Sequence, residues 1–116
     1  MPIPNAELAV VPLAKIEEYL LNLLHPAGAP KARWFLGLGY DPSQPGQLAD
    51  DLRRALRNGV LRTSSRSAFG VKFVVDGCVV SPSGKAVGVC TVWIVEPTDH
   101  RPRLVTAYPG EVTPGA

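Results

Sequence analysis

Apolar side chains recur every three or four residues in the first half of the chain, which is the period of an α-helix. The pattern predicts a first helix over residues 12–24, starting at Pro12, a residue type that suits the first helical position. We expect this helix to end before Pro26, because the residue that precedes a proline avoids the helical conformation. Its expected inward face consists of Leu13, Ile16, Leu20, Leu23 and Leu24.

Two further helices are predicted before residue 60. A short one over residues 30–38 begins at Pro30, is capped by Gly39, and would place Lys31 and Phe35 one turn apart. A longer one covers residues 47–57 and stops at Asn58-Gly59. Its inward side chains would be Leu48, Leu52, Ala55 and Leu56.

The period changes to two residues after Gly70, which indicates β-strands. Asp76-Gly77, between two β-branched runs, predicts a two-residue hairpin turn. Residues 81–84 (SPSG) predict the next turn, and residues 85–96 the longest strand, whose apolar residues on both faces favour a central position. Residues 97–102 form a third expected turn, and residues 103–109 the last strand. The polar, basic segment 61–70 reads either as a loop or as an edge strand.

This order predicts an α+β domain in which two to three N-terminal helices pack on one face of a four-stranded antiparallel sheet. At 116 residues the chain is long enough for one hydrophobic core, so we expect a single domain over residues 1–116. The helical part would cover about residues 12–58 and the sheet about residues 70–109, with a loose tail at 110–116.

Composition sets broad limits on function. With 46% hydrophobic and 19% charged residues the chain is of the globular class, and its net charge of +2 permits an acidic partner without implying one. The N-terminal residues 1–15 lack a basic segment followed by a sustained apolar run, and no run in the chain approaches the roughly 20 apolar residues of a membrane helix. We therefore expect a cytoplasmic protein with no membrane partner, although a toxin domain exported within a larger protein would look the same. Cys78 and Cys90 are too few and too far apart for a Cys-x-x-Cys zinc site.

Three motifs occur together in this chain: YLLN…HPAGAPKARWFLGLGY over residues 19–40, TVWIVE at 91–96 and PRLVTAYP at 102–109. In this combination the chain resembles a small uncharacterised bacterial domain family whose members occur alone and as the last module of polymorphic toxins. That family is similar in layout to the barnase, EndoU, colicin and RelE (BECR) group of ribonuclease toxins. In that group, N-terminal helices precede a four-stranded antiparallel sheet that carries the active site on its open face.

The resemblance to the ribonuclease group implies RNA cleavage without a metal or other cofactor. In such a reaction the ribose 2′-hydroxyl attacks the neighbouring phosphorus, which requires a base, an acid and groups that stabilise the phosphorane. The resemblance makes His25 the general acid or base, and it makes Lys31 and Arg33 the cations that neutralise the developing charge. Thr106 and Tyr108, two residues apart on the last strand, share one face and would contact phosphate or stack on a base.

Each candidate also has a purely structural interpretation. His25 can cap the last carbonyls of the first helix, and Lys31 with Arg33 can form the polar side of a helical turn. Thr106 and Tyr108 suit any strand, and Trp93 suits the core as well as base stacking. Four arginines form either a solvated surface or a patch that tracks RNA, namely Arg53, Arg57, Arg62 and Arg66.

The leading hypothesis from the sequence is a bacterial toxin-like, metal-independent endoribonuclease, controlled by a cognate antitoxin or immunity protein. Two alternatives remain open: a catalytically inactive module of the same fold that binds a partner protein, and an RNA-binding domain without cleavage.

Overall fold

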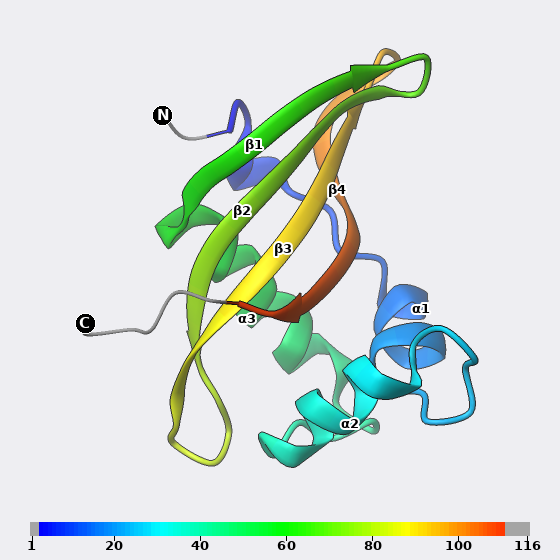
Figure 1. Ribbon diagram of the computed structural model, residues 1–116, viewed down its shortest axis with the longest axis vertical. Coiled ribbons are helices and arrows are strands. Elements are labelled where there is room, and N and C mark those ends of the chain that lie inside the picture. Colours follow the sequence, from blue (N-terminus) through cyan, green and yellow to red (C-terminus); the bar gives the residue numbers. More distant parts are fainter. Residues whose placement is uncertain (1–2, 111–116) are drawn as a thin grey trace.

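The computed structural model describes residues 3–110, in which helices come first and strands follow (Figure 1). The helical elements are η1 (Ala6–Leu8), α1 (Leu13–Lys15), η2 (Ile16–Leu20), α2 (Ala29–Gly37) and α3 (Pro45–Asn58). The strands are β1 (Val60–Ser67), β2 (Gly70–Val80), β3 (Ala86–Glu96) and β4 (Asp99–Pro109). The predicted α+β class, with N-terminal helices on a four-stranded antiparallel sheet, is confirmed for the described residues.

The sheet is an antiparallel meander in the order β1-β2-β3-β4, so β3 has the central position expected for it. The hairpin turn expected at Asp76-Gly77 is wrong, because both residues lie inside the continuous strand β2. The Asp76 carboxylate accepts two hydrogen bonds from the Arg62 guanidinium on β1, at 2.8 and 2.7 Å. Gly77 packs against the backbone of Ala55 in α3. Two tertiary contacts therefore override the turn propensity of this dipeptide.

The other strand boundaries differ from the expected ones at both ends of the sheet. The sheet begins at Val60 rather than near residue 70, and the polar segment after it is the edge strand β1, one of the two alternatives. The turn at residues 81–84 is confirmed. The last turn is shorter than expected and consists of Pro97 and Thr98, so that His100 lies on β4 with its side chain exposed.

The hydrophobic core lies between α3 and one face of the sheet, and α3 crosses behind β2 and β3 in Figure 1. All four side chains expected to point inward from this helix are buried: Leu48, Leu52, Ala55 and Leu56. Trp93 is 0% exposed in the same core, and its indole N–H donates to Thr91 Oγ1 at 2.8 Å. Base stacking by Trp93 is therefore wrong, because no face of the ring is accessible.

The first predicted helix ends four residues early, at Leu20 instead of Leu24. Its last turn is a π-turn, in which Leu21 N–H donates to the Ile16 carbonyl at 2.8 Å. Asn22 then ends the helix, because its amide donates to the Glu18 carbonyl and accepts from Leu24 N–H, at 3.1 and 2.9 Å. Ile16 and Leu20 are buried as expected, but Leu13, Leu23 and Leu24 are exposed, and Leu21 is buried in their place.

The second helix agrees with its prediction to within one residue at each end, and Gly39 after it has the left-handed φ of 98°. The expected loose tail falls outside the described residues except for Gly110, whose N–H donates to the Gly88 carbonyl at 3.1 Å.

Within residues 3–110 the helices are all too short or too polar to cross a membrane.

Candidate functional site

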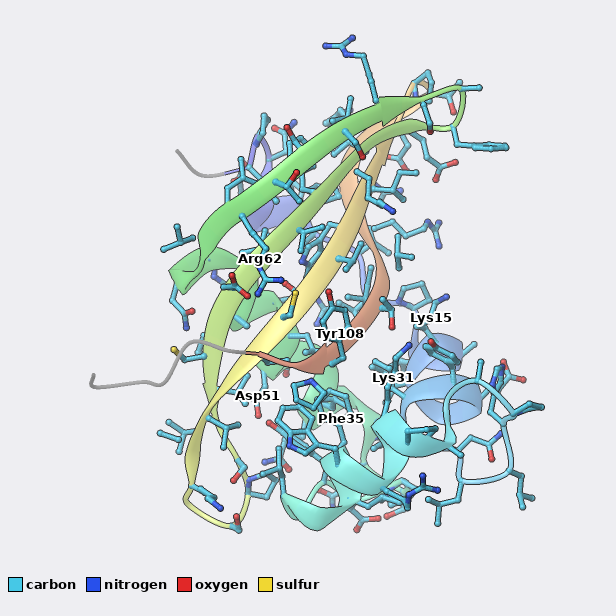
Figure 2. The ribbon with its side chains drawn as sticks, viewed as in Figure 1. Lys15, Lys31, Phe35, Asp51, Arg62 and Tyr108 are labelled. Carbon is cyan, nitrogen blue, oxygen red and sulfur yellow. The ribbon has the colours of Figure 1, made fainter. Side chains whose placement is uncertain are left out.

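Tyr19 lies where η2, α2 and β4 meet. Its hydroxyl accepts a hydrogen bond from the Lys31 ammonium on α2, and it lies 3.4 Å from Thr106 Oγ1 on β4. The Lys31 ammonium is also 4.9 Å from the centre of the Tyr19 ring, a cation–π distance. Figure 2 shows Lys15 and Lys31 gathered beside β4. Tyr19 therefore joins two predicted site residues, Lys31 and Thr106, that are 75 positions apart in the sequence.

His25 lies beside these residues, in the loop that follows η2. Tyr19, Lys31, Thr106 and His25 are called the Tyr19 group below. Its ring meets the Tyr19 ring edge to face, with 4.9 Å between centroids and 83° between planes. Its Nδ1 accepts hydrogen bonds from the backbone N–H groups of Ala27 and Gly28, at 3.1 and 3.0 Å. The expected capping of the first helix's carbonyls by this ring is therefore wrong: the ring caps its own loop. With Nδ1 used as an acceptor, Nε2 carries the proton and offers a donor to a ligand.

Gly28 allows the His25 loop to fold back onto Tyr19. A Cβ at this position would lie 3.0 Å from the Tyr19 ring and closer still to the Tyr19 carbonyl. Next to it, the Ala32 N–H donates to the Gly28 carbonyl at 2.9 Å, which begins α2 and directs Lys31 toward Tyr19. One short loop thus sets the positions of both His25 and Lys31.

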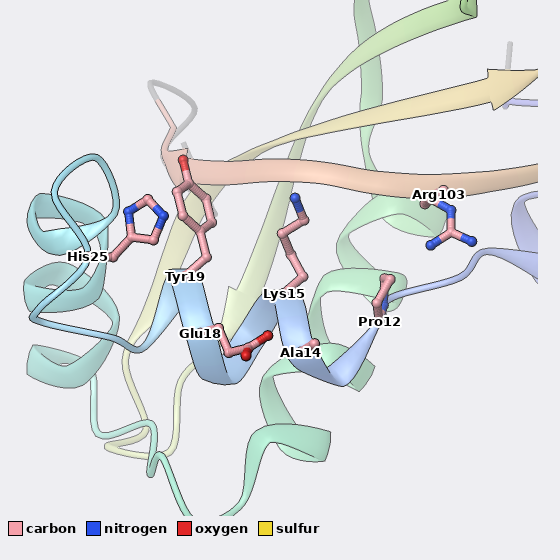
Figure 3. Close-up of a pocket in the computed structure, with 7 residues that line it drawn as sticks. All are labelled: Pro12, Ala14, Lys15, Glu18, Tyr19, His25 and Arg103. Carbon is pink, nitrogen blue, oxygen red and sulfur yellow. The ribbon is translucent and has the colours of Figure 1, made fainter.

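An open pocket of about 580 Å³ lies beside Tyr19, between η2 and β4 (Figure 3). His25 is at one end of it and Arg103 is at the other, with Tyr19 and Lys15 between them. Glu18 contributes a carboxylate to the lining. The pocket therefore presents basic side chains and a tyrosine to solvent, which suits an anionic ligand.

The environment of Tyr19 lowers the pKa of its hydroxyl below the ordinary value of 10.0. The largest cause is the hydrogen bond from Lys31, followed by the hydrogen bond with Thr106, while partial burial acts in the opposite direction. The positive charges of Lys31 and Lys15 lower the pKa further. Each of these groups stabilises the phenolate, so the arrangement favours a tyrosine that accepts a proton.

Tyr108 lies on the same sheet face as Thr106, as the two-residue spacing predicts, because Thr106 pairs with Val92 and Tyr108 with Cys90. It belongs to a separate row across the sheet that continues to Asp76 and Arg62. A hydrogen bond between the Tyr108 hydroxyl and the Cys90 thiol is the largest cause that raises the pKa of Tyr108. Burial is the main cause that raises the pKa of the Cys90 thiol. Tyr108 is therefore next to the Tyr19 group, with its hydroxyl directed toward the centre of the sheet.

The structure does not bring the remaining candidates together with this group. Arg33 is exposed, and two residues along an α-helix place it about 200° around the axis from Lys31. On α3, Arg53 pairs with Asp50 at 2.8 Å and donates to the Ala9 carbonyl, and Arg57 is exposed. Arg66 is exposed near the β1–β2 turn, at the other end of the sheet.

The expected arginine patch is divided by the sheet itself. Arg53 and Arg57 belong to α3, which covers one face, whereas Arg62 joins the row of Asp76, Cys90 and Tyr108 on the opposite face. A single RNA-tracking surface made by these arginines is therefore wrong.

Sequence reasoning missed three residues of the site: Lys15, Tyr19 and Arg103. Tyr19 is the first residue of the YLLN motif, and Lys15 precedes it by one helical turn, which is the one local signal for the pair. Arg103 reaches the pocket because β4 is tied to the N-terminal segment. The Val10 N–H donates to the Pro102 carbonyl at 2.7 Å, and the Leu104 N–H donates to the Val10 carbonyl at 3.0 Å.

Metal-ligating side chains do not converge anywhere in residues 3–110, where groups of three or more His, Cys, Asp or Glu suited to a metal ion are absent. What the Tyr19 group offers is a hydroxyl, an ammonium and an imidazole N–H around one point, together with a basic pocket. Such a set can move a proton and stabilise negative charge on a phosphate or acyl group.

A solved structure with a similar fold is the contact-dependent growth inhibition toxin–immunity protein complex from Klebsiella pneumoniae 342. One of its chains superposes with a TM-score of 0.69 at 18% sequence identity, covering 88% of this chain and 100% of that chain. No curated protein matches the chain. The family described as "Domain of unknown function (DUF6883)" matches residues 2–111, which is nearly the whole sequence. The chain therefore belongs to the DUF6883 family.

Proposed function

We propose that this protein is a toxin-like endoribonuclease that cleaves RNA without a metal ion at the Tyr19 group. The observation that carries the proposal is the hydrogen-bonded series from Lys31 through Tyr19 to Thr106, with His25 beside it and an open basic pocket in front. The fold shared with one chain of a toxin–immunity protein complex supports a role in a toxin system. The BECR-like element order supports RNA as the substrate.

The chemistry follows from the donors and acceptors at the group. The Tyr19 phenolate takes the proton of the ribose 2′-hydroxyl, and the 2′-oxygen attacks phosphorus. The 5′-oxygen leaves with a proton from the Lys31 ammonium, which gives a 2′,3′-cyclic phosphate and a 5′-hydroxyl. The Nε2–H of His25 donates a hydrogen bond to a non-bridging oxygen, while the Thr106 hydroxyl uses its one hydrogen to orient the Tyr19 phenolate. Tyr19 and Lys31 share a hydrogen bond, so one proton transfer from the phenol to the amine restores both.

This scheme assigns His25 a narrower role than general acid or base. The Nδ1 of His25 already accepts hydrogen bonds from the backbone N–H groups of Ala27 and Gly28. The ring is thus held as an Nε2–H donor, and proton transfer falls to Tyr19 and Lys31.

A partner protein belongs to the same proposal. An endoribonuclease made inside a cell damages its host unless it is inhibited, so we infer a cognate antitoxin or immunity protein. The similar solved structure is a complex of a toxin with an immunity protein, which supports a partner protein for this chain.

A matched pair of variants on α2 tests the proposal. Purified protein is incubated with total RNA in excess EDTA, beside Lys31→Met and Arg33→Met, which remove one cation each from opposite faces of the same helix. We expect the wild type and Arg33→Met to cleave, and Lys31→Met to lose roughly 10²- to 10⁴-fold in rate, as expected for loss of a group that transfers a proton. Equal rates for the two variants would refute the assignment. Absence of cleavage by the wild type would leave binding of RNA or of a partner as the function.

His25 is tested by two substitutions that separate its loop contacts from ligand contact. In His25→Asn the amide oxygen can accept from the Ala27 and Gly28 N–H groups, whereas in His25→Ala these donors lose their acceptor. If His25 only shapes the loop, Asn restores activity that Ala loses. We expect both variants to be slow, because both lack the Nε2–H donor.

A further inference from the structure

The pocket extends beyond the proposed reacting group. Arg103 on β4 forms its far end and His25 its near end, and Lys15 on α1 lies between Tyr19 and Arg103 (Figure 3). Because Val10 is hydrogen-bonded to both neighbours of Arg103, the start of α1 and this part of β4 are fixed relative to one another. The two cations therefore face the same space from two elements with a defined separation.

Both cations can accept an anion. Among residues 3–110 there is no carboxylate within ion-pair distance of the Lys15 ammonium, which lies 5.5 Å from the centre of the Tyr19 ring. The Arg103 Nε is 3.7 Å from Glu96 Oε1, a long contact between two half-exposed side chains that leaves the other guanidinium N–H groups available. Glu18 opposes them as a lining carboxylate. An anion with more than one oxygen can bind both cations at once.

The distance along β4 relates this pair to the reacting group. Arg103 and Thr106 are three residues apart, which corresponds to at most about 10 Å of strand. A bulge at the pairing with β3 shortens this distance. This separation suits a neighbouring phosphate of a polynucleotide, and a volume of about 580 Å³ leaves room for the nucleotide that joins the two phosphates.

We propose that Lys15 and Arg103 form a second phosphate-binding subsite, which holds the phosphate next to the scissile one. The inference rests on the proposed ribonuclease function and defines its substrate class. The substrate is then an RNA chain of at least three nucleotides, because a dinucleoside monophosphate has no phosphate to place in the subsite.

Substrate length provides the test. The kcat/KM values are measured for a ribodinucleoside monophosphate and for two trinucleotides, extended by one nucleotide at the 5′ or the 3′ end. We expect one trinucleotide to be cleaved roughly tenfold or more faster than the dinucleotide, the effect of one charge-assisted phosphate contact. In Arg103→Gln the ratio of the trinucleotide to the dinucleotide kcat/KM falls toward one. The control is Lys85→Gln, which removes an exposed cation in the β2–β3 turn, and there the ratio stays at the wild-type value. An unchanged ratio in Arg103→Gln would overturn the subsite.

A binding measurement keeps the subsite testable if no cleavage occurs. The affinity of the corresponding 2′-O-methyl trinucleotides, which lack the attacking hydroxyl, is measured against salt concentration. The Arg103→Gln variant should reduce the slope of log K against log salt by about 0.7, the contribution of one single-strand phosphate contact. If this reduction is seen without cleavage of RNA by the wild type, the proposed function fails and the subsite stands. If cleavage is seen and neither the slope nor the length ratio changes, the subsite fails alone.

Discussion

Replacing Gly77 by alanine tests the contact that sets the distance between α3 and the sheet. A Cβ at residue 77 would lie 2.9 Å from the carbonyl carbon of Ala55 and 3.1 Å from its Cα, and closer still to the carbonyl oxygen. Ordinary contacts between carbon atoms are about 3.5–4.0 Å, so the helix and the strand must separate by roughly 0.5–1 Å. All blocking atoms belong to the backbone, and no side-chain rotation relieves the overlap.

The expected loss of stability follows from the packing around this contact. Overpacking a close-packed core costs typically about 1–3 kcal/mol, and we expect the upper end because backbone must move. For a chain near 100 residues, each kcal/mol corresponds to a fall in Tm of about 4 °C, so Gly77→Ala should melt about 12 °C lower. Thermal unfolding followed by circular dichroism measures the shift.

Gly46→Ala is the matched control, because Gly46 is in the first turn of the same helix and a Cβ there meets nothing within 4 Å. Alanine should leave the stability unchanged or raise it by up to about 1 kcal/mol. Equal melting temperatures for Gly77→Ala and the wild type would refute the close packing of α3 on β2.

Two further predictions concern the tyrosines. Tyr40→Phe removes the hydroxyl that donates to the buried Asp51 carboxylate at 2.7 Å, and it should lower the free energy of unfolding in urea by about 1–3 kcal/mol; an unchanged urea midpoint would contradict this. Lys31→Met removes the largest cause of the lowered pKa of Tyr19, so the ionisation of Tyr19 should move to higher pH. Ultraviolet titration of tyrosinate measures the pH midpoint of this ionisation, and the titration curve of Tyr19→Phe is subtracted to remove the signal of the other tyrosines. An unchanged or lower midpoint in Lys31→Met would contradict the prediction.

The helices α2 and α3 were predictable because local signals determine them. Proline near the start, a glycine or Asn-Gly at the end and apolar residues at helical spacing all act within one element, and the observed bounds agree closely. The first helix ended early because the Asn22 side chain competes for backbone groups, an effect that the leucine pattern around it hides.

The errors in the sheet arose where distant residues decide the conformation. Asp76-Gly77 has the composition of a turn, but Arg62 and Ala55 hold it in a strand, and neither partner is near it in sequence. Tertiary contacts commonly override propensity in this way.

The candidate site was predictable in part. The alternation of β4 correctly placed Thr106 and Tyr108 on one face. Tyr19 was missed because its place in the candidate site depends on residues 31 and 106, which only the folded chain brings to its hydroxyl. The sequence left Trp93 open between the core and base stacking, because an aromatic residue in a strand has the same local pattern whether it faces the core or solvent, and the structure places it in the core.

The central claim is that the Tyr19 group cleaves RNA through the ribose 2′-hydroxyl. The most direct measurement compares the wild type and Tyr19→Phe on one RNA in excess EDTA, with chemical identification of the product ends. We expect the wild type to produce 2′,3′-cyclic phosphate and 5′-hydroxyl ends, and Tyr19→Phe to be slower by roughly 10²- to 10⁴-fold. Cleavage by Tyr19→Phe at the wild-type rate, products with other ends, or intact RNA after incubation with the wild type would contradict the claim.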